Sequence, residues 1–279
     1  MARANQPLAF VVARKAAVES SGTADEMLEQ QDVDSAPAPV PLWRRAKRRL
    51  RPPVERVLAP GGCVVGARTD EPLVAITFDD GPDRSWTAPI LEVLSARGTR
   101  ATFFFLCANA EAAPALARRV IAEGHEVGLH GVDHTNLTTL SARAVLRRTR
   151  DGRRRLEEIV GAPVRWFRPP YGEQRIRSYA MVRAAGLDVV MWSTVGDDWL
   201  EQPAERAAQL IVPAVRPGAV VLLHDGWEPP KRKVSPPTFD RARMVEVLLD
   251  GLDDRGYRAT SIGDLVSGRK VVRSAASIV

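Results

Sequence analysis

The 279-residue sequence predicts an α/β fold, built either as a parallel barrel or as a doubly wound sheet. From Pro72 onward, short apolar segments rich in β-branched and aromatic residues alternate about seven times with segments of helical periodicity. Polar side chains follow several of the expected strands at their carboxyl ends, where parallel α/β folds build their sites. A hydrophobic content of 45% is sufficient for a core of this size.

The expected strands are short apolar segments, and several expected helices stop at glycine. Ser141 is a good N-cap for a long basic helix that runs to Val160, where Gly161 ends it. The expected strands cover residues 73–78, 100–106, 126–129, 164–167, 187–192, 219–223 and 257–260. The expected helices cover residues 86–97, 114–123, 142–160, 176–185, 204–215 and 241–254.

Residues 1–60 predict a largely disordered tail ahead of a folded domain at 61–279. Residues 16–41 lack a repeating apolar face and end in a run of proline and alanine. Residues 43–56 contain seven basic side chains. We expect a solvated basic segment, with docking on an anionic membrane surface as the alternative. We expect no nucleic-acid partner, because no recognised binding motif accompanies the basic cluster.

The first residues do not predict a secretory signal or a membrane span. The apolar core at 8–13 is shorter than the ~7–15 residues of a secretory segment, and no apolar run reaches ~20 residues. We therefore expect a cytoplasmic protein, with association at a membrane surface through residues 43–56 as an option. Cys63 and Cys107 form no CxxC pair, and we expect two buried thiols.

Two adjacent carboxylates, Asp79 and Asp80, end the first of the expected strands. Gly81 and Pro82 then turn the chain. Adjacent acids at the end of an apolar strand repel each other and resist desolvation. Their position is understandable if one binds a cation and the other relays a proton. A solvated turn is the alternative that the four residues alone leave open.

A pair of histidines, His130 and His134, predicts a metal site. On one helical turn, this spacing places both imidazoles on the same side, which suits a single ion. Asp80 is available to complete the set, and two histidines with one aspartate suit Zn²⁺, with Co²⁺ or Ni²⁺ as alternatives. A pair of satisfied histidines is the other interpretation of the spacing. His224 ends another strand, and we expect His125 to be structural.

Five motifs in chain order extend this pattern: Thr77–Pro82, His130 with His134, Arg168–Gly172, Asp198 with Trp199, and Leu222–His224. Together they resemble the signatures of the polysaccharide deacetylases, which are carbohydrate esterase family four and carry the NodB homology domain. The resemblance spans about residues 72–265. It implies a distorted (β/α)7 parallel barrel and metal-dependent removal of acetyl groups from N-acetylated sugars.

The resemblance also implies a role for each matched residue. Asp79 would be the general base that activates water, and Arg168 would orient it. The metal ligands would be Asp80, His130 and His134. A backbone N–H near Tyr171 would help to hold the oxyanion.

On the other side of the reaction, His224 would be the general acid that protonates the departing amine. Asp198 would hold and charge His224, and Trp199 would pack beside it. The sequence departs from the family pattern at two places. Gly131 stands where a serine or threonine usually follows the first histidine, and Val195 replaces an additional aspartate.

The substrate that the resemblance implies is an N-acetylglucosamine-type polysaccharide or oligosaccharide. One alternative is a small or lipid-linked N-acyl amino sugar of a biosynthetic pathway. Another is a barrel that binds glycan without turnover, although the joint presence of the expected ligands, base and acid argues against it. The sequence does not identify the oligomeric state.

Overall fold

A computed structural model describes residues 61–228, 235–275 and 278. The expected tail at 1–60, with its basic segment at 43–56, lies outside these residues. The strands are β1 (Cys63–Arg68), β2 (Leu73–Asp79), β3 (Thr102–Leu106), β4 (Glu126–Gly131), β5 (Trp166–Phe167), β6 (Asp188–Val189), β7 (Thr194–Val195), β8 (Ala219–His224), β9 (Arg258–Thr260) and β10 (Lys270–Ser274). The helices are α3 (Thr87–Ala96), α4 (Cys107–Ala112), α5 (Pro114–Ala122), α6 (Ala142–Val160), α7 (Ile176–Ala184), α8 (Ala204–Ile211), α9 (Arg241–Asp253) and α10 (Ile262–Val266), with 3₁₀ turns η2 (Leu137–Thr139) and η3 (Pro170–Gly172).

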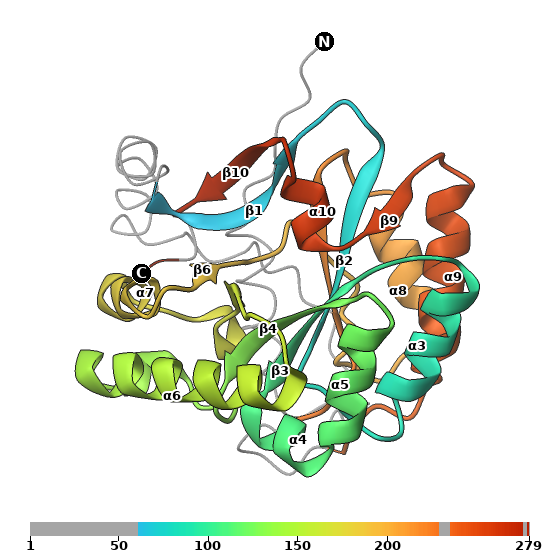
Figure 1. Ribbon diagram of the computed structural model, residues 1–279. Helices are drawn as coiled ribbons and strands as arrows, with labels where there is room; N and C mark the ends of the chain where they lie inside the picture. Colours follow the sequence, from blue (N-terminus) through green and yellow to red (C-terminus); the bar gives the residue numbers. More distant parts are fainter. Residues whose placement is uncertain (1–60, 229–234, 276–277, 279) are drawn as a thin grey trace, which may run out of the picture.

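One sheet forms the centre of the fold, in the order β10-β1-β8-β2-β3-β4-β5-β6 (Figure 1). In addition, β7 pairs with β8 and β9 pairs with β2. The strands from β8 through β2 to β6 run parallel, as the sequence predicts. Strand β1 runs antiparallel to both β10 and β8, so the sheet is mixed rather than wholly parallel. This is the distorted barrel that the family resemblance implies.

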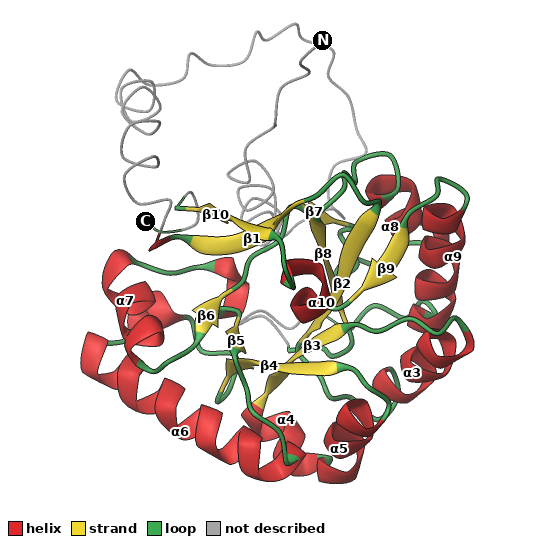
Figure 2. Ribbon diagram, turned by 45° about the horizontal axis from the view of Figure 1, so that its top comes forward, coloured by secondary structure: helices red, strands yellow, loops and turns green. Residues whose placement is uncertain are grey.

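The sheet curls until its two sides meet. Val64 of β1 forms a parallel bridge with Val190, just after β6, and accepts a hydrogen bond of 2.8 Å from the backbone N–H of Met191. The larger helices surround the curled sheet on its outside (Figure 2). The carboxyl ends of β2, β4, β5 and β8 therefore meet at one end of the barrel.

Strand β2 shows how the sequence separates the interior of the barrel from its outer layer. All seven of its residues are buried. Because alternate side chains point to opposite faces of a strand, Thr77 and Asp79 share one face while Phe78 points to the other. Phe78 stacks on Phe103, its neighbour in β3, with ring centroids 4.9 Å apart. Thr77 and Asp79 are left to face the polar groups of the site.

The predicted elements differ from the observed ones mainly where tertiary contacts define a strand. Helix α6 begins and ends as predicted, because the Ser141 side chain accepts a hydrogen bond from the N–H of Ala144 and Gly161 has a φ of 68°. By contrast, the strands expected at 164–167 and 187–192 shorten to β5 and β6, with two residues each. The sequence analysis did not predict β1, β7, β10, α4 or α10.

Other expectations concern individual side chains. Cys63 and Cys107 are both buried, as expected. His125 is also buried, and its Nδ1 accepts a hydrogen bond of 3.1 Å from the N–H of Ala101, which is a structural role. Within the ranges described above, no helix combines the length and the apolar character needed to cross a bilayer.

Candidate metal and catalytic site

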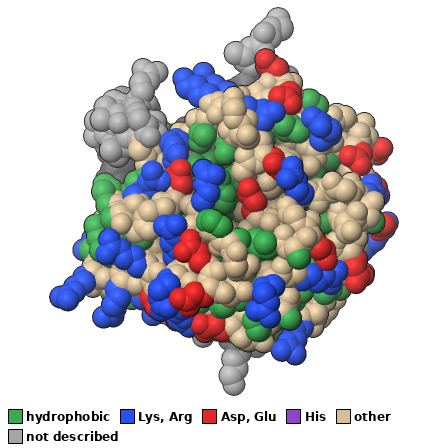
Figure 3. All heavy atoms as spheres, viewed as in Figure 1, with side chains coloured by type: hydrophobic (Ala, Val, Ile, Leu, Met, Phe, Trp, Pro, Cys, Tyr) green, Lys and Arg blue, Asp and Glu red, His purple; other side chains and the backbone are tan. Residues whose placement is uncertain are grey.

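The residues singled out in the sequence converge at the carboxyl end of the barrel. Asp79 is the last residue of β2, and Asp80 follows it with a φ of 74°. Aspartate is among the few side chains that tolerate this left-handed conformation. The turn directs the two neighbouring carboxylates to different partners. The face in Figure 3 shows no histidine; His130 and His224 are buried, and His134 is partly buried.

Asp80, His130 and His134 form a compact set of potential metal ligands. Asp80 Oδ1 lies 3.2 Å from His130 Nε2 and 3.3 Å from His134 Nε2. One ligand atom from each residue lies within 4.8 Å of the others. Asp80 Oδ1 is buried and has no hydrogen-bond partner among the described residues. A buried oxygen that faces two imidazole nitrogens in this way fits a divalent cation, and this donor set suits Zn²⁺ and similar metals.

The two histidines do not lie on a helical turn, although their spacing suggested one. His130 lies in strand β4, and His134 follows it in a bend, so neither residue is helical. The Nδ1 atom of His130 lies 2.9 Å from the carbonyl oxygen of Arg168. Since a carbonyl only accepts, Nδ1 carries the proton and Nε2 keeps its lone pair toward Asp80. The prediction of a shared site is supported, but its helical explanation is wrong.

Burial opposes the charge of Asp80, yet the attraction of His134 and His130 outweighs it and holds the pKa of this carboxyl well below its usual range. Asp80 is therefore an anion throughout the neutral pH range. A second contact fixes its backbone, because Asn109 Nδ2 donates a hydrogen bond of 2.8 Å to the carbonyl oxygen of Asp80. Asn109 lies in α4, and no pattern in the sequence marked it.

Asp79 is held by a buried arginine. Arg168 Nη1 donates to Asp79 Oδ1 at 2.7 Å and to Thr77 Oγ1 at 2.8 Å, so it contacts the two polar side chains on the inner face of β2. Arg168 follows β5 and is fully buried, with its guanidinium 4.1 Å from the ring centroid of Phe104. This pairing keeps a carboxylate stable in a buried position.

A second carboxylate holds His224, the last residue of β8. Asp198 Oδ1 lies 2.9 Å from His224 Nδ1, and Asp198 Oδ2 accepts a hydrogen bond of 2.7 Å from the His224 backbone N–H. Burial opposes the charge of Asp198, but His224 and Arg241 outweigh it and lower the pKa of this carboxyl. Because an ionised carboxylate only accepts, Nδ1 carries a proton and Nε2 is the ring nitrogen available for chemistry.

The register of the sheet places the Asp79–Arg168 pair beside the His224–Asp198 pair. Asp79 of β2 is the direct neighbour of His224 in β8. Tyr171 approaches from η3, with its ring centroid 4.3 Å from that of His134 and a φ of 61° that is rare for a tyrosine. Trp199 stands nearly perpendicular to His224, with ring centroids 5.8 Å apart.

The two departures from the family pattern have different surroundings. Gly131 has a φ of 138°, and a Cβ atom there would lie 2.7 Å from the carbonyl oxygen of Asp133. A serine or threonine could not adopt this local backbone without a shift. Val195 lies in β7, paired with Leu222 of β8, and packs against the hydrophobic core.

The site includes two buried ionisable residues for which the sequence suggested no role. Arg241, the first residue of α9, donates to Asp198 Oδ2 at 3.0 Å. Asp225 follows His224, is fully buried, and accepts a hydrogen bond of 2.7 Å from Thr87 Oγ1. Burial, reinforced by the charges of Asp80 and Asp79, raises the pKa of Asp225 to about 8. Arg241 lies far from the motifs along the chain, so only its contacts reveal it.

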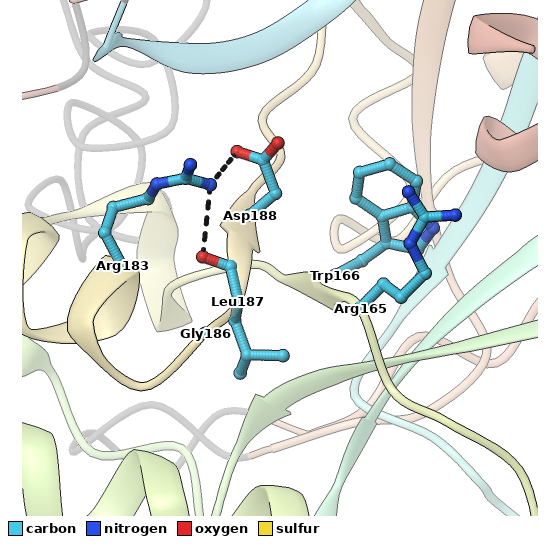
Figure 4. Close-up of a pocket in the computed structure, with 6 residues that line it drawn as sticks. All are labelled: Arg165, Trp166, Arg183, Gly186, Leu187 and Asp188. Carbon is cyan, nitrogen blue, oxygen red and sulfur yellow. Dashed lines mark hydrogen bonds and ion pairs between the residues drawn. The ribbon is translucent and has the colours of Figure 1, made fainter.

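A cavity of about 270 Å³ lies away from this site, at the amino-terminal ends of β5 and β6 (Figure 4). Arg183 points to Asp188 and to the carbonyl oxygen of Leu187, while Arg165 lies against the ring of Trp166. These charged groups are already paired, and the cavity brings together none of the proton acceptors or ligand sets found at the other end.

At the carboxyl end of this α/β barrel a buried carboxylate, a buried histidine and a potential cation-ligand set lie together, an arrangement suited to hydrolysis. Comparisons with known proteins identify the family. A family model described as polysaccharide deacetylase matches residues 66–190. A chitooligosaccharide deacetylase of Sinorhizobium fredii is 34% identical over 197 residues, which cover 70% of this chain and 92% of that protein.

A second relative, a peptidoglycan-N-acetylglucosamine deacetylase of Bacillus cereus, is 32% identical over 202 residues, covering 71% of this chain and 89% of that protein. Among solved structures, a family 4 acetyl xylan esterase from Clostridium thermocellum in complex with a cobalt ion has a TM-score of 0.63 and 28% identity, covering 70% of this chain and 90% of that one. The chain therefore belongs to the polysaccharide deacetylase family, carbohydrate esterase family 4. This confirms the family and the enzyme class expected from the five motifs.

Proposed function

We propose that this chain hydrolyses the N-acetyl group of an N-acetylglucosamine-type sugar within an oligosaccharide or polysaccharide, and that residues 61–279 form its catalytic domain. The observation that supports the proposal most strongly is that Asp79 and His224, both buried and both paired with an opposite charge, lie beside the potential metal ligands. Asp79 is paired with Arg168 at 2.7 Å, and His224 is paired with Asp198 at 2.9 Å. The sheet register makes Asp79 and His224 neighbours, so both reach the same substrate bond.

The residues that would hold a cation are Asp80, His130 and His134, and Zn²⁺, Co²⁺ or Ni²⁺ all suit this set. Such a cation, when bound, lowers the pKa of water and polarises a carbonyl oxygen. The Nδ1 contact of His130 with the Arg168 carbonyl fixes the imidazole for this purpose. A cobalt ion in a solved relative supports a divalent metal without selecting one.

Asp79 acts as the general base in this proposal. Its carboxylate takes a proton from the attacking water as the water oxygen bonds to the acetyl carbon. Arg168 compensates for the buried charge of Asp79 and fixes its orientation, since the guanidinium donates to it and to Thr77 on the same face. A backbone N–H near Tyr171 stabilises the negative charge that develops on the carbonyl oxygen.

His224 completes the reaction as the general acid. Asp198 holds the Nδ1–H, so Nε2 delivers a proton to the amide nitrogen as the carbon–nitrogen bond breaks. The products are acetate and a free amino sugar. Trp199 packs against the His224 ring and limits its movement.

The named relatives support the proposed substrate class. One acts on chitooligosaccharide and another on the N-acetylglucosamine of peptidoglycan, and these substrates share the N-acetylglucosamine unit. Acetate release from a substrate panel tests the proposal: chitooligosaccharides, peptidoglycan fragments, and monomeric, nucleotide-linked and lipid-linked N-acetylglucosamine. We expect release from the oligomers, loss with chelator, and recovery with added Zn²⁺ or Co²⁺. Release from small or lipid-linked sugars alone would change the substrate class, and no release from any substrate would overturn the proposal.

Two substitutions test the proton-transfer roles. We expect Asp79→Asn and His224→Ala each to lower kcat by at least about 10²-fold, the usual scale for an acid or base group. Circular dichroism and metal content should stay at wild-type values. Asp253→Asn, at an exposed ion pair on α9, is the matched control and should keep full activity. A near-normal rate in the Asp79 variant would exclude this residue as the base.

A further inference from the structure

Arg241 is a buried cation for which no role has yet been given. Its side chain is 1% exposed and lies between two aromatic rings, 4.3 Å from the ring centroid of Trp86 and 5.2 Å from that of Phe239. Nε and Nη2 have no hydrogen-bond partner among the described residues. The aromatic faces contact the guanidinium, which leaves Nη1 as its one hydrogen-bonding group within that part of the chain.

The position of Arg241 is unfavourable for a cation on general grounds. Removing a guanidinium from water is costly unless an anion compensates for it. Arg241 is also the first residue of α9, where the positive end of the helix dipole repels a cation. Both costs are offset at one place, because Nη1 donates to Asp198 Oδ2 at 3.0 Å and to the backbone carbonyl of His224 at 3.0 Å.

These two contacts connect the side chain that holds His224 with the backbone that carries it. Asp198 receives three hydrogen bonds: from His224 Nδ1 at 2.9 Å, from the His224 N–H at 2.7 Å and from Arg241 at 3.0 Å. Arg241 therefore prevents Asp198 Oδ2 from rotating away from β8. It also compensates for the charge of Asp198 on the side opposite the imidazole.

We propose that Arg241 is a positioning residue for the acid step: it fixes the Asp198–His224 pair so that Nε2 of His224 faces the departing nitrogen. The inference rests on the proposed function, in which His224 is the acid. In that step the C–N bonding pair passes to nitrogen and His224 Nε2 gives its proton to that nitrogen; the proton from the attacking water has already passed to Asp79 in the preceding step. Arg241 touches neither the substrate nor the reacting atoms.

A role in the acid step has a signature that depends on the leaving group. The amine of an N-acetyl sugar must be protonated to depart, whereas a nitrophenolate departs without a proton. A defect confined to His224 should therefore slow amide hydrolysis and spare an activated aryl acetate. A general loss of structure or of bound metal should slow both reactions equally.

The experiment compares wild type, Arg241→Met, Arg241→Lys and His224→Ala on a chitooligosaccharide and on 4-nitrophenyl acetate, each with Zn²⁺ bound. We expect Arg241→Met to lower kcat on the amide by about tenfold or more, with KM and the rate on the ester within about twofold of wild type. Arg241→Lys should recover part of the amide rate, since it keeps the charge but loses the planar fork. Arg273→Met, which removes an arginine–aspartate pair remote from the site, is the matched control and should leave both rates unchanged.

Equal losses on amide and ester, or a lowered melting temperature with normal kcat, would overturn the assignment. If Arg241→Met does not fold, Arg241→Lys serves as the test instead. A selective loss of the amide rate relative to the ester rate supports the role, and bound zinc is measured in each variant. If wild type does not hydrolyse the ester, the amide substrate alone decides. A lower kcat of Arg241→Met at constant KM, partly restored in Arg241→Lys, supports the role, and an unchanged kcat overturns it. Failure of wild type to hydrolyse any amide would instead overturn the proposed function.

Discussion

At the level of single residues, the candidate site is organised as pairs of opposite charges that would each be unstable alone. Asp79 has Arg168, and Asp198 has both His224 and Arg241. Each pair is buried, so removal of one partner leaves an uncompensated charge in the low-dielectric protein interior. Such pairs restrict side-chain movement, and this is the property that proton transfer at fixed atoms requires.

Asp225 differs from these residues because no cationic side chain of the described residues lies within hydrogen-bonding distance of it. Its Oδ2 accepts a hydrogen bond from the Thr87 hydroxyl, and its Oδ1 has no hydrogen-bond partner among the described residues. With a pKa of about 8, it is protonated in the folded protein at neutral pH, whereas in the unfolded chain it ionises near 3.8. The unfolded state therefore binds fewer protons, and stability falls as pH rises between these two values.

The variant Asp225→Asn should lack this pH dependence. We expect metal-free wild type to lose stability relative to the variant between pH 5 and pH 7, by on the order of 2 kcal/mol. Urea denaturation of both proteins at the two pH values measures the difference. A stability gap that is the same at both pH values would show that Asp225 is already ionised in the folded state.

The sequence was informative about residues whose chemistry is concentrated in short motifs. Asp79 with Asp80, and His130 with His134, are such pairs, and the structure brings Asp80 and the histidines together. Arg241 and Asn109 gave no comparable signal, since a lone arginine or asparagine on a helix is ordinary. Their importance arises from contacts with residues 17 to 43 positions away, which local patterns do not encode.

At the level of elements, the loops after β2 and β8 are packed so closely that only glycine fits between them. A Cβ atom on Gly226 would lie 2.4 Å from the backbone carbon and oxygen of Asp80. The loop that carries a proposed metal ligand is thus supported by the loop that follows His224. The position of Asp80 depends on the backbone of another element as well as on its own turn.

Substitution of this glycine should weaken cation binding without touching a ligand. We expect Gly226→Ala to displace Asp80 and to raise the Kd for Zn²⁺ by about tenfold or more, as for other residues that support metal ligands. Isothermal titration calorimetry measures the affinity. Gly61→Ala is the control and should bind normally, because within the described residues no atom beyond the chain neighbours lies within 4 Å of the added Cβ. An unchanged Kd in Gly226→Ala would mean that the two loops move apart without cost.

Elements with local start and stop signals could be predicted from the sequence, whereas strands that depend on tertiary pairing could not. Helix α6 carries its own start and stop signals, Ser141 and Gly161, so both of its ends are predictable from local patterns. Strands β5 and β6 are short because only a few of their residues pair in the curled sheet. Strand β10 is mostly half-exposed and lacks an apolar pattern, so its pairing with β1 depends on the tertiary fold.

At the level of the whole molecule, the barrel joins parts of the chain that are distant in sequence. The three potential ligands come from the loop after β2, the end of β4 and the bend beyond it, with β3 between the two strands in the sheet. A cation bound by all three would connect these segments in the folded protein alone. The unfolded chain has no equivalent site, so binding should stabilise the fold.

Thermal unfolding should therefore depend on the metal concentration. At a free Zn²⁺ concentration 100 times Kd, the free energy of unfolding should rise by about 2.7 kcal/mol, which raises Tm by roughly 5–10 °C for a domain of this size. Differential scanning fluorimetry with chelator and with graded Zn²⁺ measures the shift. His134→Gln should unfold near the metal-free wild-type temperature at every Zn²⁺ concentration, because the ligand set is incomplete. If wild type and His134→Gln respond equally to Zn²⁺, the ion binds elsewhere, and Asp80, His130 and His134 do not form the metal site.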